Sequence, residues 1–259
     1  MPGTPWNTTH LAPRLAVDAT CAAAAATLVA PLITMVDQCV MENASGKRRM
    51  AASLRASLHG LLRRPRRFLA ARPFRLIALL YAGTYLSANA IDSAHATLRR
   101  APAAATTAGP AKFLATTAAN LSLCLYKDAQ FTRMFATGPP RPLPPATYAL
   151  FALRDALTIF ASFNLPPLLA PLLPTASPTA AQFLAPAAIQ LLSTPLHLLG
   201  LDLYNRPAPA VSLAARLRKV RVDWLPSSLA RMCRIVPAFG LGGVVNARLR
   251  ANLMRRLEH

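Results

Sequence analysis

Charged residues are scarce in this chain of 259 residues. Asp, Glu, Lys and Arg together make up 15% of the sequence, against about 25% in an ordinary soluble domain. Apolar residues make up 54%, and the mean hydropathy is +0.33. Sparse charge with abundant apolar residues is typical of a chain that is partly solvated by lipid, so a membrane protein is favoured over a soluble one.

Lysine and aromatic residues are also rare, which bears on the meaning of the net charge of +20. Nearly all the basic residues are arginines, and lysine occurs only at positions 47, 112, 127 and 219. A nucleic-acid surface usually interleaves basic residues with aromatic ones, which are only 7% of this chain. We therefore expect no nucleic-acid partner, although a soluble RNA-binding protein remains an alternative.

The cysteines are few and scattered: Cys21, Cys39, Cys124 and Cys233 form no CxxC pair and have no nearby histidine at ligand spacing. This scatter argues against a disulfide framework or a zinc site. The chain also shows no paired carboxylates, HExxH motif, ordered Ser-His-Asp set or glycine-rich phosphate loop. We expect neither an enzyme nor a bound cofactor or metal.

Long apolar runs are present instead, and they divide the chain into six segments. The first extends from about residue 11 to residue 40, and residues 19–36 within it are uncharged and long enough to cross a membrane. The others are 76–91, 113–126, 146–173, 180–201 and 235–247. The sequence therefore predicts an all-α fold, a single multi-span membrane domain over residues 1–259 with about six helices.

Two connections between these segments are strongly basic. Residues 45–75 hold ten Lys or Arg and no acid, and residues 206–234 form the second basic connection. Within the first, Met50, Leu54 and Leu58 recur at helical spacing between arginines. A helix of this kind lies on a membrane surface, so we expect contact with the lipid bilayer, and with anionic lipid in particular.

A degenerate threefold pattern links the six segments. Each odd-numbered segment ends in an aspartate, and these residues are Asp37, Asp128 and Asp202. Each even-numbered segment has an arginine near its entry or within it, and these residues are Arg75, Arg154 and Arg231. The repeat units predicted from this pattern are approximately 11–98, 109–173 and 180–250.

Several stretches are similar to known membrane families. The stretches "ENASGKRRMAASLRASLHGLLRRPRRFLAARPFRLIALLYAGTY" at 42–85 and "DWLPSSLARMCRIVPAFGLGG" at 223–243 resemble repeats of the mitochondrial carrier family, in which three two-helix repeats surround a central path. The phrases "NLSLCLYKD", "ALRDALTIFASFNLPPLLAP" and "TPLHLLGLDLYNR" are similar to an uncharacterised fungal family labelled sequence orphan. These resemblances imply an inner mitochondrial membrane location in a fungus.

By resemblance to the carriers, the expected function is transport of an anionic metabolite through a basic central path. The three arginines would contact the solute or a gate, and the three aspartates would lie on the matrix side. The chain departs from the carrier signature, in which an acid stands two positions after a proline; Ile33 and His197 occupy those positions here. A carrier-derived membrane scaffold or membrane-dynamics factor that transports nothing is therefore the alternative.

Two charged pairs leave alternatives open. Arg154 stands beside Asp155 within an apolar run, and adjacent helical residues point about 100° apart. The pair therefore either lies near the membrane interface or makes buried polar contacts in a path. Asp202 and Arg206 are four residues apart, which suits either a gate or an ordinary surface pair. We expect helix-to-helix hydrogen bonds from the polar side chains within apolar runs, which are Asn120, Asn164, Gln190 and His197.

Overall fold

The computed structural model of the chain describes residues 6–169, 184–207 and 211–258. Within these ranges every regular element is a helix, as the sequence predicted. The elements are α1 (Leu11–Ser45), α2 (Met50–Arg63), α3 (Pro65–Ala70), α4 (Arg72–Arg99), α5 (Gly109–Phe135), α6 (Pro145–Leu169), α8 (Gln190–Asn205), α9 (Leu213–Cys233), the π-helical turn η2 (Val236–Leu241) and α10 (Gly242–Glu258).

Three helical segments of the described chain are long and apolar enough to cross a membrane: α1, α4 and Leu184–Asn205, which includes α8. The prediction that the described chain is all-α is confirmed, and these three helical segments are candidate membrane spans. The six-helix carrier arrangement is not confirmed, and the predicted sixth apolar segment continues into the basic helix α10. The units 109–173 and 180–250 lie partly outside the described residues, so the division into three repeats stays a prediction.

Glycine and proline set the helix boundaries. Gly46 ends α1 in a left-handed conformation with φ of 77°, and the next amide, of Lys47, donates to the Glu42 carbonyl. This is the usual glycine-based helix stop, since only glycine adopts that φ without strain. Pro65, Pro73 and Pro110 lie in the first turns of α3, α4 and α5, where no amide hydrogen bond is lost.

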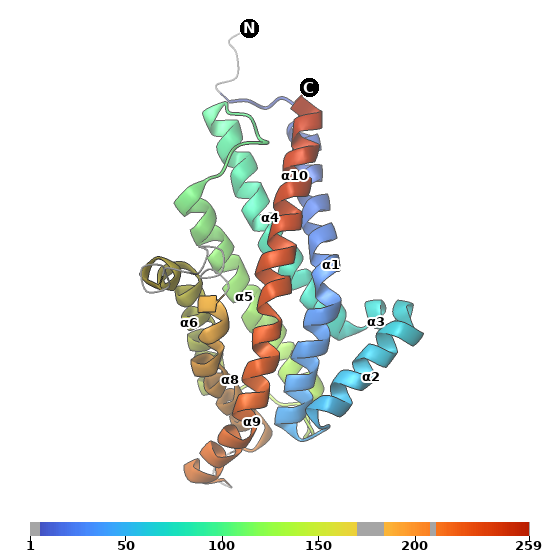
Figure 1. Cartoon of the computed structure of the whole chain (residues 1–259), viewed down its shortest axis with the longest axis vertical. Coiled ribbons are helices and arrows are strands. Elements are labelled where there is room, and N and C mark those ends of the chain that lie inside the picture. Colours follow the sequence, from blue (N-terminus) through green and yellow to red (C-terminus); the bar gives the residue numbers. More distant parts are fainter. Residues whose placement is uncertain (1–5, 170–183, 208–210, 259) are drawn as a thin grey trace.

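The long helix α1 packs along α4 and α10, and the three helices run side by side along the long axis of the molecule (Figure 1). Between residues 21 and 30 its buried face is mostly alanine: Ala22, Ala25, Ala26 and Ala30. Small residues let helix backbones approach closely, which replaces the hydrophobic effect as a source of association within lipid. This face fixes α1 as the element against which the others are arranged.

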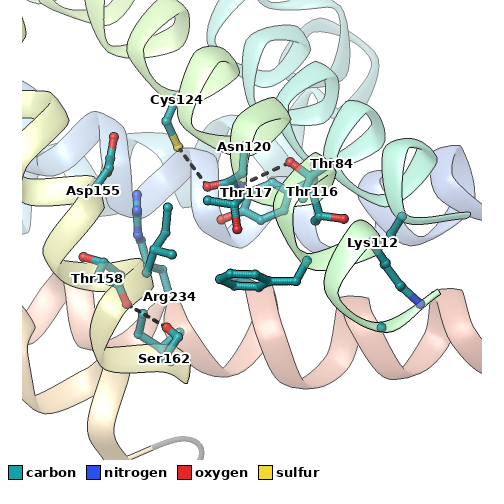
Figure 2. A pocket seen from close by; sticks show the side chains of 17 residues that line it. Thr84, Lys112, Thr116, Thr117, Asn120, Cys124, Asp155, Thr158, Ser162 and Arg234 are labelled. Atoms are coloured by element: carbon teal, nitrogen blue, oxygen red, sulfur yellow. Dashed lines mark hydrogen bonds between the residues drawn. The ribbon is translucent and has the colours of Figure 1, made fainter. Parts of the chain in front are cut away.

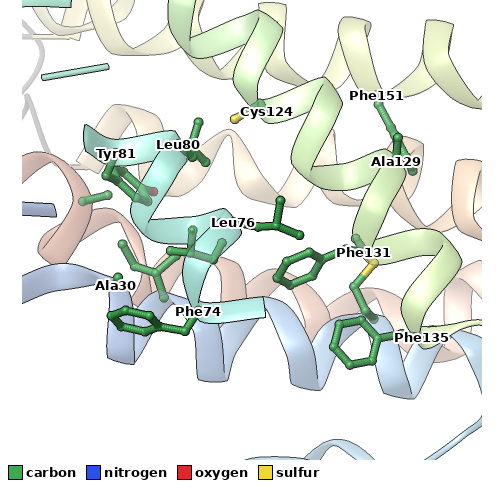
Figure 3. Close-up of a cluster of buried hydrophobic side chains, with 14 of the residues drawn as sticks. Ala30, Phe74, Leu76, Leu80, Tyr81, Cys124, Ala129, Phe131, Phe135 and Phe151 are labelled. Carbon is green, nitrogen blue, oxygen red and sulfur yellow. The ribbon is translucent and has the colours of Figure 1, made fainter. Parts of the chain in front are cut away.

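An aromatic cluster holds α4 and α5 against α1 (Figure 3). Phe131 is fully buried and meets Phe135 edge to face, with ring centroids 5.3 Å apart. Phe74 belongs to the same core. The ammonium group of Lys127 lies 5.3 Å from the centroid of the Phe131 ring, so the aromatic core directly supports a buried charge.

The helix α2 contacts α1 through serines and leaves its leucines exposed. Ser53 and Ser57 are buried, whereas Leu54, Leu58 and Leu62 are 41%, 44% and 73% exposed. In Figure 1 this helix projects from the main bundle. An exposed leucine stripe next to arginines suits the surface of a bilayer, but lipid contact by this connection stays a prediction.

A group of polar side chains joins α1, α4 and α10 near both chain ends. Arg250 donates to Asp18 at 2.6 Å and to Ser93 at 2.9 Å. Asn89 and Asn246 donate to each other at 3.0 and 2.8 Å. All five side chains are buried, and together they satisfy charges and amides that would otherwise destabilise this end of the bundle.

Close packing at Gly242 gives a direct test of this arrangement. A Cβ atom there would lie 2.0 Å from the hydroxyl of Tyr85, which donates to the Ala238 carbonyl. We expect Gly242→Ala to lower the free energy of unfolding by about 1–3 kcal/mol through overpacking. A Cβ at Gly243 meets nothing within 4 Å, so Gly243→Ala is the matched control and should leave stability equal or slightly higher. Thermal unfolding in detergent measures both, and equal effects would contradict this packing.

Candidate functional site

Charged side chains gather inside the bundle, and we call this group the charge cluster. Its members come from α1, α5, α6 and α9 and from the residue that follows α9: Asp37, Lys127, Asp128, Arg154, Asp155, Arg231 and Arg234. All except Arg234 are buried, and the Arg234 side chain is only 12% exposed. The cluster therefore lies in the interior of the helical bundle.

Lys127 and Asp37 tie three parts of the chain together. The Lys127 Nζ atom lies 2.8 Å from Asp37 Oδ2 and 2.5 Å from Asp128 Oδ1. The other oxygen of Asp37 accepts from Arg234 Nη1 at 2.6 Å. One aspartate of α1 is thereby held by a base of α5 and by a base at the end of α9.

Arg154 organises the other half of the charge cluster. Its Nη2 atom is 2.5 Å from Asp128 Oδ2 and 2.6 Å from Asp155 Oδ1. Its Nη1 atom is 2.7 Å from His197 Nδ1. Since a guanidinium group can only donate, the His197 Nδ1 atom must be the unprotonated nitrogen, and the imidazole is neutral in this arrangement.

Burial of these charges has a meaning specific to a membrane protein. Asp37 and His197 lie within the candidate spans α1 and Leu184–Asn205. A charged residue within a membrane is costly unless it is paired, and such residues mark solute or ion pathways more often than they serve packing alone. The charge cluster is therefore where a transport path would be sought.

A pocket of about 350 Å³ lies beside the charge cluster, lined by α4, α5, α6 and the segment that follows α9 (Figure 2). Asp155 and Arg234 reach it at one end and Lys112 at the other. The wall between them is mostly apolar, with hydroxyl and amide groups supplied by Thr84, Thr116, Thr117, Asn120, Thr158 and Ser162. The volume falls within the usual range of small-molecule sites.

The pocket combines a mostly apolar lining with side chains of both charges. An acid and a base, Asp155 and Arg234, stand at the same end, and each also has a partner in the charge cluster: Arg154 for Asp155 and Asp37 for Arg234. Lys112 is also paired, with Asp92 Oδ2 at 2.6 Å, and its side chain is 35% exposed. In the described part of the chain no three His, Cys, Asp or Glu side chains group as metal ligands.

The structure brings together five of the eight residues proposed from the sequence: Asp37, Asp128, Arg154, Asp155 and Arg231. Of the two alternatives for Arg154 and Asp155, buried polar contact is the one found.

The other three predicted site residues lie elsewhere. Arg75 is exposed near the start of α4 and does not reach the charge cluster. Asp202 forms a separate group with Arg206 and with the buried Arg216, which holds α8 against α9. Asp202 therefore does not join Asp37 and Asp128 in the charge cluster, because it lies more than one helical turn beyond His197, the residue of α8 that contacts Arg154.

Sequence reasoning missed several residues of the site. Arg234, Lys112 and the pocket threonines were not singled out, although Arg234 follows Arg231 by three residues and so shares its helix face. The expected helix-to-helix bonds are found for Asn120, which donates to Thr84 at 3.2 Å, and for Gln190, which accepts from Arg231 at 3.1 Å. The side chain of Asn164 lies outside the described residues.

Comparison with known proteins gives one family. A family model described as probable citrulline exporter matches residues 21–254, a range that contains the whole charge cluster and pocket. A comparison with curated proteins gives no match. The matched family is not the mitochondrial carrier family, so the predicted relationship to carriers is wrong. An exporter family supports membrane transport, and it says nothing of a mitochondrial or fungal origin.

Removal of one lysine tests whether the charge cluster is essential to the fold. We expect Lys127→Ala to lower the free energy of unfolding by about 3–5 kcal/mol, because two buried aspartates lose their shared base. Lys219 forms a partly exposed pair with Asp223 on α9, so Lys219→Ala is the matched control and should cost under about 1 kcal/mol. Thermal unfolding in detergent compares them. Similar losses for the two variants would show that the buried ion pairs of Lys127 stabilise the fold no more than the pair of Lys219 and Asp223 does.

Proposed function

The chain belongs to the probable citrulline exporter family, and from this premise we propose that it moves citrulline, or an amino acid of the same chemistry, across a membrane. The pocket and the charge cluster form part of the path. The proposed activity is transport without chemical change of the solute.

The observation that carries the proposal is the presence of Asp155 and Arg234 together at one end of the pocket. Citrulline at neutral pH has an ammonium group and a carboxylate on the same carbon, and a neutral ureido group at its far end. Asp155 suits the ammonium and Arg234 suits the carboxylate. Asn120 and Thr158 supply donors and acceptors of the kind that a ureido group requires.

The anionic metabolite predicted from the sequence fits this pocket less well. A solute with carboxylates alone offers no cation to Asp155, and Lys112, at the other end of the pocket, is already paired with Asp92. A zwitterion offers an ammonium group to Asp155 and a carboxylate to Arg234. The predicted inner mitochondrial location rested on the resemblance to carriers, and the family match removes that support.

A membrane scaffold that transports nothing is the second candidate. The observation that favours it is the projecting helix α2, with its exposed leucines among arginines (Figure 1). A surface of this kind could hold the protein against lipid or a partner without any solute path. The scaffold and the exporter differ in whether purified protein alone moves a solute.

Uptake of labelled citrulline into vesicles containing the purified full chain tests the proposal. We expect saturable uptake, and a fall of about tenfold or more in Asp155→Asn and Arg234→Gln, since each removes one charged contact with the zwitterion. The matched controls are Asp223→Asn and Arg255→Gln, which alter an outer pair on α9 and an exposed side chain on α10. Thermal unfolding of each variant shows whether it is folded.

Competition identifies the groups that are recognised. Unlabelled citrulline should compete, whereas the decarboxylated analogue and the analogue acylated on its α-amino group should compete poorly. Uptake of a dicarboxylate in preference to citrulline would contradict the proposal and support an anionic metabolite as the solute. Absence of uptake for every solute in a broad panel would favour the scaffold.

A further inference from the structure

One buried base in the charge cluster, Arg231, has no acid to pair with. All nine aspartate and glutamate side chains lie in the described part of the chain, and each forms an ion pair with a lysine or arginine. The buried Lys and Arg side chains of these residues are Arg14, Lys127, Arg154, Arg216, Arg231 and Arg250. Every one of them except Arg231 is within 4.0 Å of a carboxylate oxygen.

The surroundings of Arg231 do not neutralise it. Its side chain is 3% exposed, and its Nε atom donates to the neutral amide oxygen of Gln190 at 3.1 Å. Asp37 and Asp128 are near enough to interact with it electrostatically, but both already bind other bases at 2.5–2.8 Å. The charge cluster holds four bases and three acids, so one positive charge is left over.

An uncompensated buried charge destabilises a protein strongly, and more so within a membrane. Its presence indicates a negative partner that arrives from outside the chain. Two fully buried hydroxyl groups on the contacting helices α8 and α9, those of Thr194 and Ser227, have no hydrogen-bond partner among the described residues. Ser227 is four residues before Arg231 on α9, and Thr194 is four residues after Gln190 on α8, so each shares the helix face of its neighbour.

We propose that Arg231, with Thr194 and Ser227, forms a second carboxylate-binding position on the transport path. Arg234, which lines the pocket, follows Arg231 by one helical turn, so a carboxylate released by Arg234 meets Arg231 next. A guanidinium with two free hydroxyl donors matches the geometry of a carboxylate. The position is closed by the contact between α8 and α9, and it becomes accessible when these helices separate. This inference rests on the proposed function.

Separate measurement of binding and transport tests this role. In Arg231→Gln the pocket keeps Asp155 and Arg234, so we expect equilibrium binding of citrulline within about threefold of the unmodified protein, while the maximal uptake rate falls about tenfold or more. Arg231→Lys keeps the charge but loses the planar guanidinium group, which can bind both oxygens of a carboxylate, and should give an intermediate uptake rate. The control is Arg221→Gln, on an exposed part of α9, which should leave both quantities unchanged.

Stability gives a second and independent readout. Without solute, Arg231→Gln should unfold at the same temperature as the unmodified protein or a higher one, because no ion pair is broken and an uncompensated charge is removed. Sodium acetate, as a simple carboxylate, should raise the unfolding temperature of the unmodified protein more than sodium chloride does. The difference should disappear in Arg231→Gln.

Three results would overturn the inference. The first is an Arg231→Gln variant that transports at the unmodified rate. The second is a loss of transport together with a lower unfolding temperature, which would give Arg231 a structural role. The third is equal stabilisation by acetate and chloride, which would exclude a carboxylate-selective position. If citrulline is not transported at all, the proposed function fails, and the acetate comparison still decides the inference because it requires no transported solute.

Discussion

The fold of this protein depends on how few negative charges it has and where they are placed. Nine acids have to neutralise the bases that the helices bury, and every one of them is used in an ion pair. Lipid cannot solvate a charge as water does, so the energetic demand for pairing is greater here than in a soluble bundle. Asp37 and Asp128 in the charge cluster, and Asp202 outside it, each pair with two bases.

This constraint connects the packing of the helices to the site. The alanine face of α1 brings α4 close, and the aromatic core around Phe131 positions Lys127 where it can bridge α1 and α5. Arg154 then links α5 to α6 and, through His197, to α8. The pocket lies alongside this network and takes its charged end from it, so the residues that stabilise the bundle also give the pocket its chemistry.

Some of this could be predicted from the sequence, since hydropathy and helical spacing are local properties. The all-α class, the first candidate span and the choice of Arg154 and Asp155 as candidate site residues follow from uncharged runs and from charges within them. Partner choice could not be predicted, because Lys127 and Asp37 are 90 residues apart. Asp202 matched Asp37 and Asp128 in the threefold pattern, yet it pairs with Arg216 of α9 instead. The carrier relationship failed because it was based on this arrangement of segments and not on the carrier signature itself.

The central claim is that the uncompensated positive charge of the cluster receives the carboxylate of the solute. Solid-state NMR of the protein in lipid can measure the distance from a ¹³C-labelled citrulline carboxylate to ¹⁵N-labelled guanidinium groups. The account predicts a contact within about 4 Å that survives Arg221→Lys and is lost when Arg231 and Arg234 are both replaced by lysine. A bound carboxylate with no such contact, or one whose contact survives that double replacement, would contradict it.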